Sequence, residues 1–240
     1  DEETSSAFEV GFTSTILDGS LQLNGALFYT EVDDMQFFEF YVGPFGLLRV
    51  VEAIDEATIQ GFELGASWQM TDSLRLDAGY SNIDGEIDEM SVRPYVSGNE
   101  IPNLAEFTAN VALTWNQEMG GLDLFGRLEY AYQGDIFYHV VQGSDLDEPR
   151  ASDFEGLPYE VPAKLFGSLA TSYDKTEVDG YGIMNLRLGV GGENWRVTAF
   201  ARNLLDEEYI AEVILAPEFG GGFVTPGAYR SAGVELEFMF

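Results

Sequence analysis

Carboxylates are the most abundant groups in this sequence that could do chemistry. The 240 residues contain 42 Asp and Glu against 11 Lys and Arg, which gives a formal net charge of −31. Paired carboxylates can cleave glycosides and clustered ones can bind calcium. With so many acids, close pairs are inevitable and indicate no catalytic site. Two clusters offer oxygen ligands but lack calcium-loop spacing, so solvated surface is the simpler interpretation: Asp84, Glu86, Asp88 and Glu89, and Asp145, Asp147, Glu148, Asp153 and Glu155.

Other reactive groups are scarce. His139 is the one histidine and there is no cysteine. An ordinary zinc site, a disulfide and a thiol nucleophile are therefore not expected. We find no Gly-x-Ser-x-Gly elbow, phosphate loop or His-Glu-x-x-His motif. The sequence predicts no enzyme, no metal and no cofactor, and its pI of about 4.1 argues against nucleic acid as a partner.

The polar residues sit in segments where every second residue is apolar. In 62–70 the apolar residues are Phe62, Leu64, Ala66, Trp68 and Met70. Successive side chains of a β-strand point to opposite faces, so such a segment has one apolar and one polar face. The alternation predicts nine strands, at roughly 6–16, 20–41, 48–70, 73–87, 105–117, 121–138, 178–191, 194–203 and 229–240.

The connections between these strands alternate in length. Tight turns are expected at 17–19, 70–73, 118–121 and 191–194, and longer connections at about 42–48, 88–104, 139–177 and 204–228. All the long loops then lie at one end of the sheet, which is typical of an outer-membrane barrel. Strands of nine or more residues also favour a membrane barrel over a soluble sandwich. Aromatic residues lie near the ends of the apolar faces, where the rings of a membrane barrel would sit at the depth of the lipid head groups: Trp68, Tyr80, Trp115, Tyr130, Tyr132 and Trp195.

Two alternatives stay open from the pattern alone. One is a soluble acidic β-sandwich that binds a ligand such as a carbohydrate, because its strands also have one buried and one wet face. The other is a passive outer-membrane barrel without energy coupling. A membrane-spanning helix is not expected, because no apolar run approaches about 20 residues.

The end of the chain resembles a known family. Segment 195–209 is similar to the penultimate strand of TonB-dependent outer-membrane receptors. Its Asn203, Leu204, Asp206 and Tyr209 match the Asn-Leu-Phe-Asp-x-x-Tyr motif of that family, with Leu205 in place of the usual Phe. Segment 226–240 resembles the last strand and ends in the aromatics Phe238 and Phe240, as a C-terminal insertion signal does. Segments 60–64 and 101–108 resemble earlier family strands, in the same order.

The resemblance implies a fold and a function. The fold class is all-β, an antiparallel up-and-down transmembrane β-barrel segment with about nine strands of a presumed 22-stranded barrel. Residues 1–240 would be the C-terminal portion of the barrel domain, without the plug, the TonB box and the earlier strands. The expected function is TonB-energised uptake of a scarce nutrient, such as a ferric siderophore, across the bacterial cell outer membrane. The expected partners are outer-membrane lipid and lipopolysaccharide, the receptor's own plug domain, TonB and a small-molecule nutrient.

The same interpretation assigns candidate site residues. Five arginines fall on the polar face of their strands and would face the lumen, where they would pair with acidic groups of the wall or plug: Arg75, Arg127, Arg187, Arg196 and Arg202. Ligand contacts are expected in the external loops, at His139, Phe219, Phe223 and Tyr229.

Overall fold

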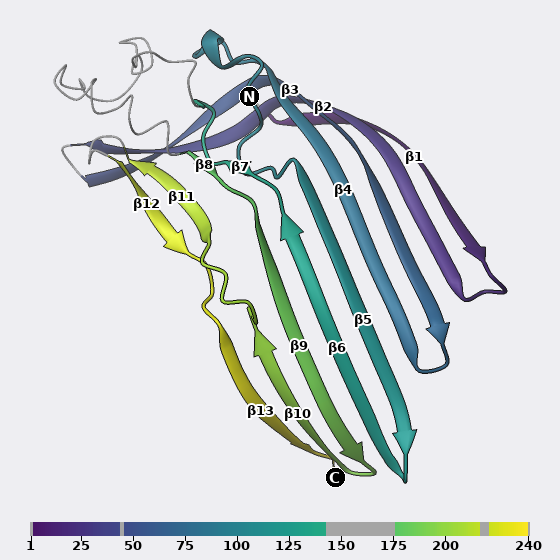
Figure 1. The fold of residues 1–240 in the computed structure, drawn as a ribbon. Helices are drawn as coiled ribbons and strands as arrows, with labels where there is room; N and C mark the ends of the chain where they lie inside the picture. Colours follow the sequence, from purple (N-terminus) through teal and green to yellow (C-terminus); the bar gives the residue numbers. More distant parts are fainter. Residues whose placement is uncertain (1, 44–45, 143–175, 217–220, 240) are drawn as a thin grey trace.

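The computed structural model describes residues 2–43, 46–142, 176–216 and 221–239. They form one nine-stranded antiparallel sheet in the order β1-β2-β3-β4-β5-β6-β9-β10-β13. All nine strands lie in chain order; β9 follows β6, and β13 follows β10 (Figure 1). Their bounds are β1 (Thr4–Ile16), β2 (Leu21–Gly43), β3 (Gly46–Thr71), β4 (Leu74–Glu89), β5 (Phe107–Met119), β6 (Leu122–Gln133), β9 (Tyr181–Gly192), β10 (Trp195–Arg202) and β13 (Ser231–Phe238).

The nine predicted strands and the four predicted tight turns are confirmed. The longer connection expected at 42–48 is wrong, because β2 continues to Gly43 and β3 begins at Gly46, where the two residues pair. Four tight turns lie at one end of the sheet, the turn end, and all longer connections lie at the other, the loop end (Figure 1). The first turn needs positive φ at Leu17, Asp18 and Gly19, with φ values of 52°, 54° and 92°. Asp and Gly tolerate this backbone geometry, and it suits the twist of a tight hairpin.

The loop end holds elements that alternation did not predict. A hairpin of β11 (Ile210–Ala216) and β12 (Gly221–Pro226) forms within the connection from β10 to β13. Short strands β7 (Ile136–Phe137) and β8 (Glu177–Val178) pair within the connection from β6 to β9. A 3-10 turn, η1 (Pro94–Val96), lies between β4 and β5.

The strand register joins the alternating side chains into two continuous faces. Leu64, Tyr80, Ala109 and Tyr132 lie opposite one another across β3 to β6, and the neighbouring row of Gly65, Gly79 and Asn110 points the other way. We call these the apolar face and the polar face. The apolar side chains are exposed, with Phe8 at 69% and Leu236 at 66%. This face therefore needs an apolar environment from outside the chain.

Aromatic rings mark both ends of the apolar face. Toward the loop end, rings lie in a row across neighbouring strands with centroid distances of 5.7, 6.2 and 5.4 Å: Phe62, Tyr80, Phe107 and Tyr132. Toward the turn end, Trp68 lies opposite Leu76, Trp115 lies opposite Leu74, and Trp195 begins β10. Two aromatic bands on either side of an apolar zone are typical of strands that cross a bilayer.

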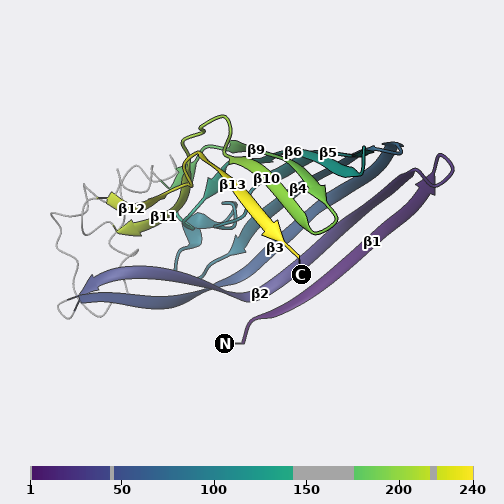
Figure 2. The same ribbon diagram turned by 90° about the horizontal axis from the view of Figure 1, so that it is seen from below.

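The sheet is curved and open (Figure 2). Within the described residues β1 and β13 are its two edges and do not pair with each other. No second sheet packs on the apolar face in the part of the chain described, whereas a β-sandwich would cover that face with one. No helix in those residues is long and apolar enough to cross a membrane.

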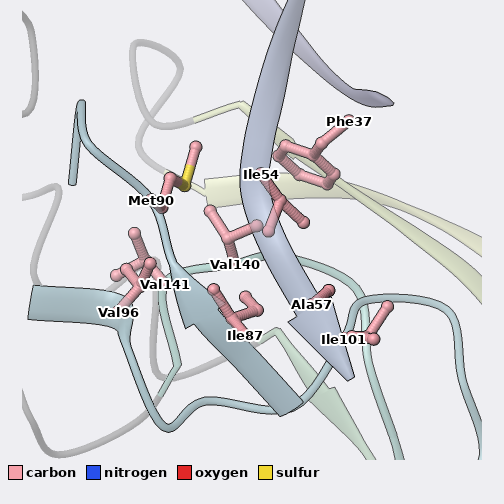
Figure 3. Packing of buried hydrophobic residues seen from close by; sticks show 9 residues of the cluster. All are labelled: Phe37, Ile54, Ala57, Ile87, Met90, Val96, Ile101, Val140 and Val141. Atoms are coloured by element: carbon pink, nitrogen blue, oxygen red, sulfur yellow. The ribbon is translucent and has the colours of Figure 1, made fainter. Parts of the chain in front are cut away.

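A hydrophobic core is nevertheless present at the loop end (Figure 3). The two loops after β4 and after β7 fold onto the ends of β2, β3 and β4 there. Hydrogen bonds join the loops: Asn99 Nδ2 donates to the Val140 carbonyl at 2.8 Å, and Gln142 exchanges two bonds with the Glu100 backbone. We call the buried apolar residues the loop-end cluster; they are Phe37, Ile54, Ala57, Ile87, Met90, Val96, Ile101, Val140 and Val141.

Candidate functional site

The predicted arginines all lie on the polar face, and Arg127, Arg187 and Arg202 lie on the neighbouring strands β6, β9 and β10. Arg127 and Arg187 are direct partners across β6 and β9, and Phe200 on β10 is the next residue in that row. Arg202 extends over the Phe200 ring, at 5.3 Å from its centroid. Arg75 on β4 and Arg196 on β10 lie nearer the turn end. The alternation of apolar and polar residues along each strand is what aims all five side chains the same way.

Four of the five arginines pair with carboxylates on the same face. Arg75 holds Asp77 through two nitrogens, and Ser67 also donates to that carboxylate at 2.7 Å. The other three pairs are Arg127–Glu129 at 2.6 Å, Arg187–Glu235 at 3.0 Å and Arg196–Glu237 at 3.7 Å. Each of these four arginines therefore has a carboxylate partner within its own sheet. The pairs are about half exposed, so each contributes little to stability and keeps its charge near solvent.

Rings on the polar face lie flat over glycines of the neighbouring strand. Phe125 occupies the space that a Cβ on Gly189 would need, and Phe200 does the same at Gly233. Arg196 lies over the Phe125 ring at 5.5 Å from its centroid. Glycine at these positions therefore lets a large ring lie along the wall rather than project from it.

The family-like motif after β10 is a compact hydrogen-bonded unit. Asn203 is 3% exposed and has φ of 48°, a conformation that asparagine adopts more readily than most residues. Its Oδ1 accepts from the Glu207 N–H at 2.9 Å, and its Nδ2 donates to the carbonyls of Glu207 and Ala228 at 2.8 and 3.0 Å. The Asn203 N–H donates to Asn185 Oδ1 on β9 at 3.1 Å. One side chain thus ends β10 and fixes the start of the loop.

The rest of the motif ties this loop to β9 and to the segment before β13. The Leu204 N–H donates to the Met184 carbonyl at 2.7 Å, and Asp206 pairs with Arg230 at 3.2 Å. The Tyr209 ring stacks on Tyr181 with a centroid distance of 4.1 Å. The motif therefore holds the loop in a fixed position.

Beside the motif lies a cleft of about 680 Å³. It lies among the upper end of β9, the motif and the β11–β12 hairpin, and it combines carboxylates with phenol rings. Its chemistry would suit a ligand with donor groups and flat apolar surface. The charged and aromatic residues that line it are Glu177, Asp179, Glu207, Glu208, Tyr181, Tyr209 and Tyr229.

Near this cleft, burial and neighbouring negative charges raise the pKa values of ionisable side chains. Burial raises the pKa of the Glu100 carboxyl, and repulsion from Glu106, Glu177, Asp135 and Asp84 raises it further. Burial also raises the pKa of the Tyr138 hydroxyl, which donates to the Ala211 carbonyl at 2.8 Å and so links the loop after β7 to β11. The loop end is thus an acidic, cross-linked surface.

The predicted ligand contacts lie in different environments. His139 is 6% exposed; its ring lies edge-on to Phe37 at 5.4 Å, and its Nδ1 accepts from the Val141 N–H. These two contacts place the ring against Phe37 and Val141 of the loop-end cluster. Tyr229 lines the cleft and is 72% exposed, and Phe223 on β12 is 58% exposed. Phe219 lies outside the described residues.

The acidic clusters and the C-terminal signal can be placed only in part. Asp84 and Asp88 accept hydrogen bonds from Gln60 and Thr58 on β3. Within the described residues no group of three or more His, Asp or Glu is arranged to hold a metal ion. The cluster at 145–155 and Phe240 lie outside those residues. Phe238 lies on the apolar face opposite Trp195 and is 67% exposed.

Comparison with known proteins identifies this architecture. Residues 1–204 match the family model described as "TonB dependent receptor-like, beta-barrel". The chain is 27% identical over 124 residues to the probable TonB-dependent siderophore receptor PiuA of Acinetobacter baumannii, which is 48% of this chain and 16% of that protein.

Solved structures share the fold across almost the whole chain. The ferric yersiniabactin uptake receptor FyuA from Yersinia pestis superposes with a TM-score of 0.72 at 18% identity, over 99% of this chain and 30% of its own. The copper transporter OprC gives a TM-score of 0.65 at 18% identity, over 98% of this chain and 31% of its own. The chain thus spans less than a third of these relatives. It belongs to the family of TonB-dependent receptors, β-barrel proteins of the bacterial outer membrane.

Proposed function

We propose that this protein is part of an outer-membrane receptor that takes up a scarce nutrient with energy delivered through TonB. The observation that carries the proposal is the family match over residues 1–204, joined to a sheet with one exposed apolar face and one charged face. In a closed barrel the apolar face contacts lipid and the polar face lines the lumen. The loop end, with its acidic surface, is then external and in reach of lipopolysaccharide.

The chain supplies the C-terminal portion of a larger barrel in this proposal. The open edges at β1 and β13 support it, because unpaired strand edges are unstable in a membrane. Almost the whole chain covers 30% of FyuA, which is consistent with about nine strands of a presumed 22-stranded barrel in a receptor that also has a plug. In this proposal the plug, the TonB box and the earlier strands belong to other parts of the receptor.

The nutrient that we propose is a metal chelate, with a ferric siderophore as the first choice. PiuA is named as a siderophore receptor and FyuA as a ferric yersiniabactin receptor, whereas OprC is named as a copper transporter. The cleft beside the motif, where Tyr229 is exposed, is the external surface that we expect the chelate to meet.

Uptake of radiolabelled iron by whole cells tests the function. Cells that lack the gene should lose uptake of at least one ferric siderophore from a panel, and the restored gene should return it. Uptake that persists when tonB is deleted would indicate the passive barrel instead. If no chelate in the panel depends on the gene, with iron or with copper, the proposal fails.

A further inference from the structure

One wall of the cleft beside the motif is made of tyrosine rings in fixed positions. The ring of Tyr209 stacks on Tyr181 with a centroid distance of 4.1 Å, and its hydroxyl accepts from the Ala228 N–H at 3.2 Å. The backbone of Gly227 lies against the same ring, where the Cβ of any other residue would overlap the ring carbons. Three contacts thus hold Tyr209, so this wall of the cleft is formed before a ligand arrives.

The charged side chains that line this cleft are all acidic. Its described lining includes no lysine and no arginine. Arg230, which follows the lining residue Tyr229, pairs instead with Asp206 at 3.2 Å. Within the parts of the chain that the structure describes, none of the carboxylates of the cleft forms an ion pair. These carboxylates belong to Glu177, Asp179, Glu207 and Glu208.

The motif fixes two of these acidic residues without neutralising them. Asn203 accepts from the Glu207 N–H at 2.9 Å and donates to the Glu207 carbonyl at 2.8 Å, so it holds the backbone and leaves the carboxylate unpaired. On the strands, by contrast, the four ion pairs described above neutralise the acidic partners of the arginines. The cleft therefore keeps a net negative charge around about 680 Å³ of space. A concave site of one charge sign concentrates ions of the opposite sign and repels ions of its own sign.

The exposed tyrosine ring of the cleft favours the same class of ligand. Tyr229 lines the cleft and is 72% exposed, so a ligand can reach its ring. The face of an aromatic ring carries negative potential and attracts organic cations such as ammonium groups. Carboxylates bind ammonium groups through charge-assisted hydrogen bonds. Rings and carboxylates together thus suit a cation that is attached to an organic molecule.

We propose that this cleft binds ligands that carry a positively charged ammonium group and excludes ligands with net negative charge. The inference rests on the proposed function, since for a nutrient receptor it selects metal chelates with a free or quaternary amine over chelates that their metal-binding groups leave anionic. Glu207 and Glu208 occupy the two positions that the Asn-Leu-Phe-Asp-x-x-Tyr motif leaves open. The motif thus positions the residues that set the charge preference.

Crystals of the whole receptor soaked with para-bromobenzyl trimethylammonium chloride provide the test, because bromine scatters anomalously and locates the cation. We expect a bromine peak in the cleft. Para-bromobenzenesulfonate has a similar brominated ring with the opposite charge, and it should give no peak there at the same concentration. A cleft without the cation, or a sulfonate peak of equal strength, would overturn the proposal.

Variants of the same receptor supply a second readout from a series of soaks. In the Glu207→Gln, Glu208→Gln double variant, the cation concentration that gives half occupancy should rise about tenfold, because two charges a few ångströms away are lost. The matched control is Glu118→Gln, Asp123→Asn, which removes two charges from a cleft at the turn end and should change nothing. An equal rise in both variants, or a rise in neither, would overturn the proposal. These readouts do not use transport, so failure of the charge preference is distinguishable from failure of the proposed uptake.

Discussion

Replacement of Asn203 by alanine should release the loop that follows β10. The substitution removes three side-chain hydrogen bonds from a site that is 3% exposed, and each is worth about 1 kcal/mol. It also forces alanine into a backbone with φ of 48°, which costs about another 1 kcal/mol. The free energy of local opening should therefore fall by about 4 kcal/mol, or roughly a thousandfold in the opening constant.

Hydrogen exchange of the detergent-solubilised receptor measures this opening directly. Peptides that cover 203–209 and 227–230 should exchange much faster in Asn203→Ala, whereas peptides from β5 should be unchanged. Asn203→Gly keeps the backbone freedom, so it should recover only about 1 kcal/mol. Asn203→Asp keeps the acceptor but turns a carboxylate oxygen toward the Glu207 and Ala228 carbonyls, so it should exchange at least as fast as Asn203→Ala at pH 7. If the alanine and glycine variants both exchange within threefold of wild type, the hydrogen bonds do not hold this loop.

Three further predictions concern other parts of the chain. Gly189→Val should collide with the Phe125 ring and cost about 1–3 kcal/mol in thermal unfolding; Phe125→Ala in the same chain should restore only part of the loss, because the Val197 carbonyl oxygen also lies 2.9 Å from the added Cβ. Glu100→Gln should raise the Tm at pH 7, because burial and nearby acids raise the pKa of this carboxyl and penalise its charged form. The wild-type penalty appears as pH rises above the ordinary value of 4.5, so the two Tm values should converge below it; a constant gap would contradict the assignment. Deletion of Phe240 should reduce the heat-modifiable, membrane-inserted form on gels, and undiminished insertion would show that this residue is no insertion signal.

Alternation alone was enough to predict the sheet. The run from Phe62 to Met70 lies within β3 with its apolar side chains on one face, as period-2 spacing requires. The turn at Leu17–Gly19 was also foreseeable, since Asp and Gly favour its positive φ values. Both properties are local, so a short stretch of sequence contains them.

Side-chain partners on different strands could not be predicted from local alternation. Spacing placed Arg187 on the polar face, but its carboxylate Glu235 lies two strands away, beyond β10. That pairing depends on the relative register of three strands. The β11–β12 hairpin was missed because Ile210–Ala216 is apolar without clean alternation.

The candidate site depends both on local sequence patterns and on contacts between segments that are distant in the chain. The motif resemblance singled out Asn203, but its role depends on the Ala228 carbonyl, which a later segment brings to it. The sequence places His139 in an external loop, because it follows a predicted strand and begins a long connection. Its burial follows from Phe37 and the valines beside it, which meet only when two distant connections fold together.

The loop-end cluster constrains the order in which the protein can assemble. Phe37 and Ile54 come from β2 and β3, whereas Val140 and Val141 follow β7, so the contacts that bury them span about a hundred residues of chain. Contacts of such long range form late, because the intervening chain must be ordered before they can be made. Each hairpin from β1 to β6 can form from local pairing, but the cluster requires β2 to β4 and the connection after β7 to be on the same side of the membrane at once. Burial of His139 would thus report that the first six strands have completed translocation and pairing.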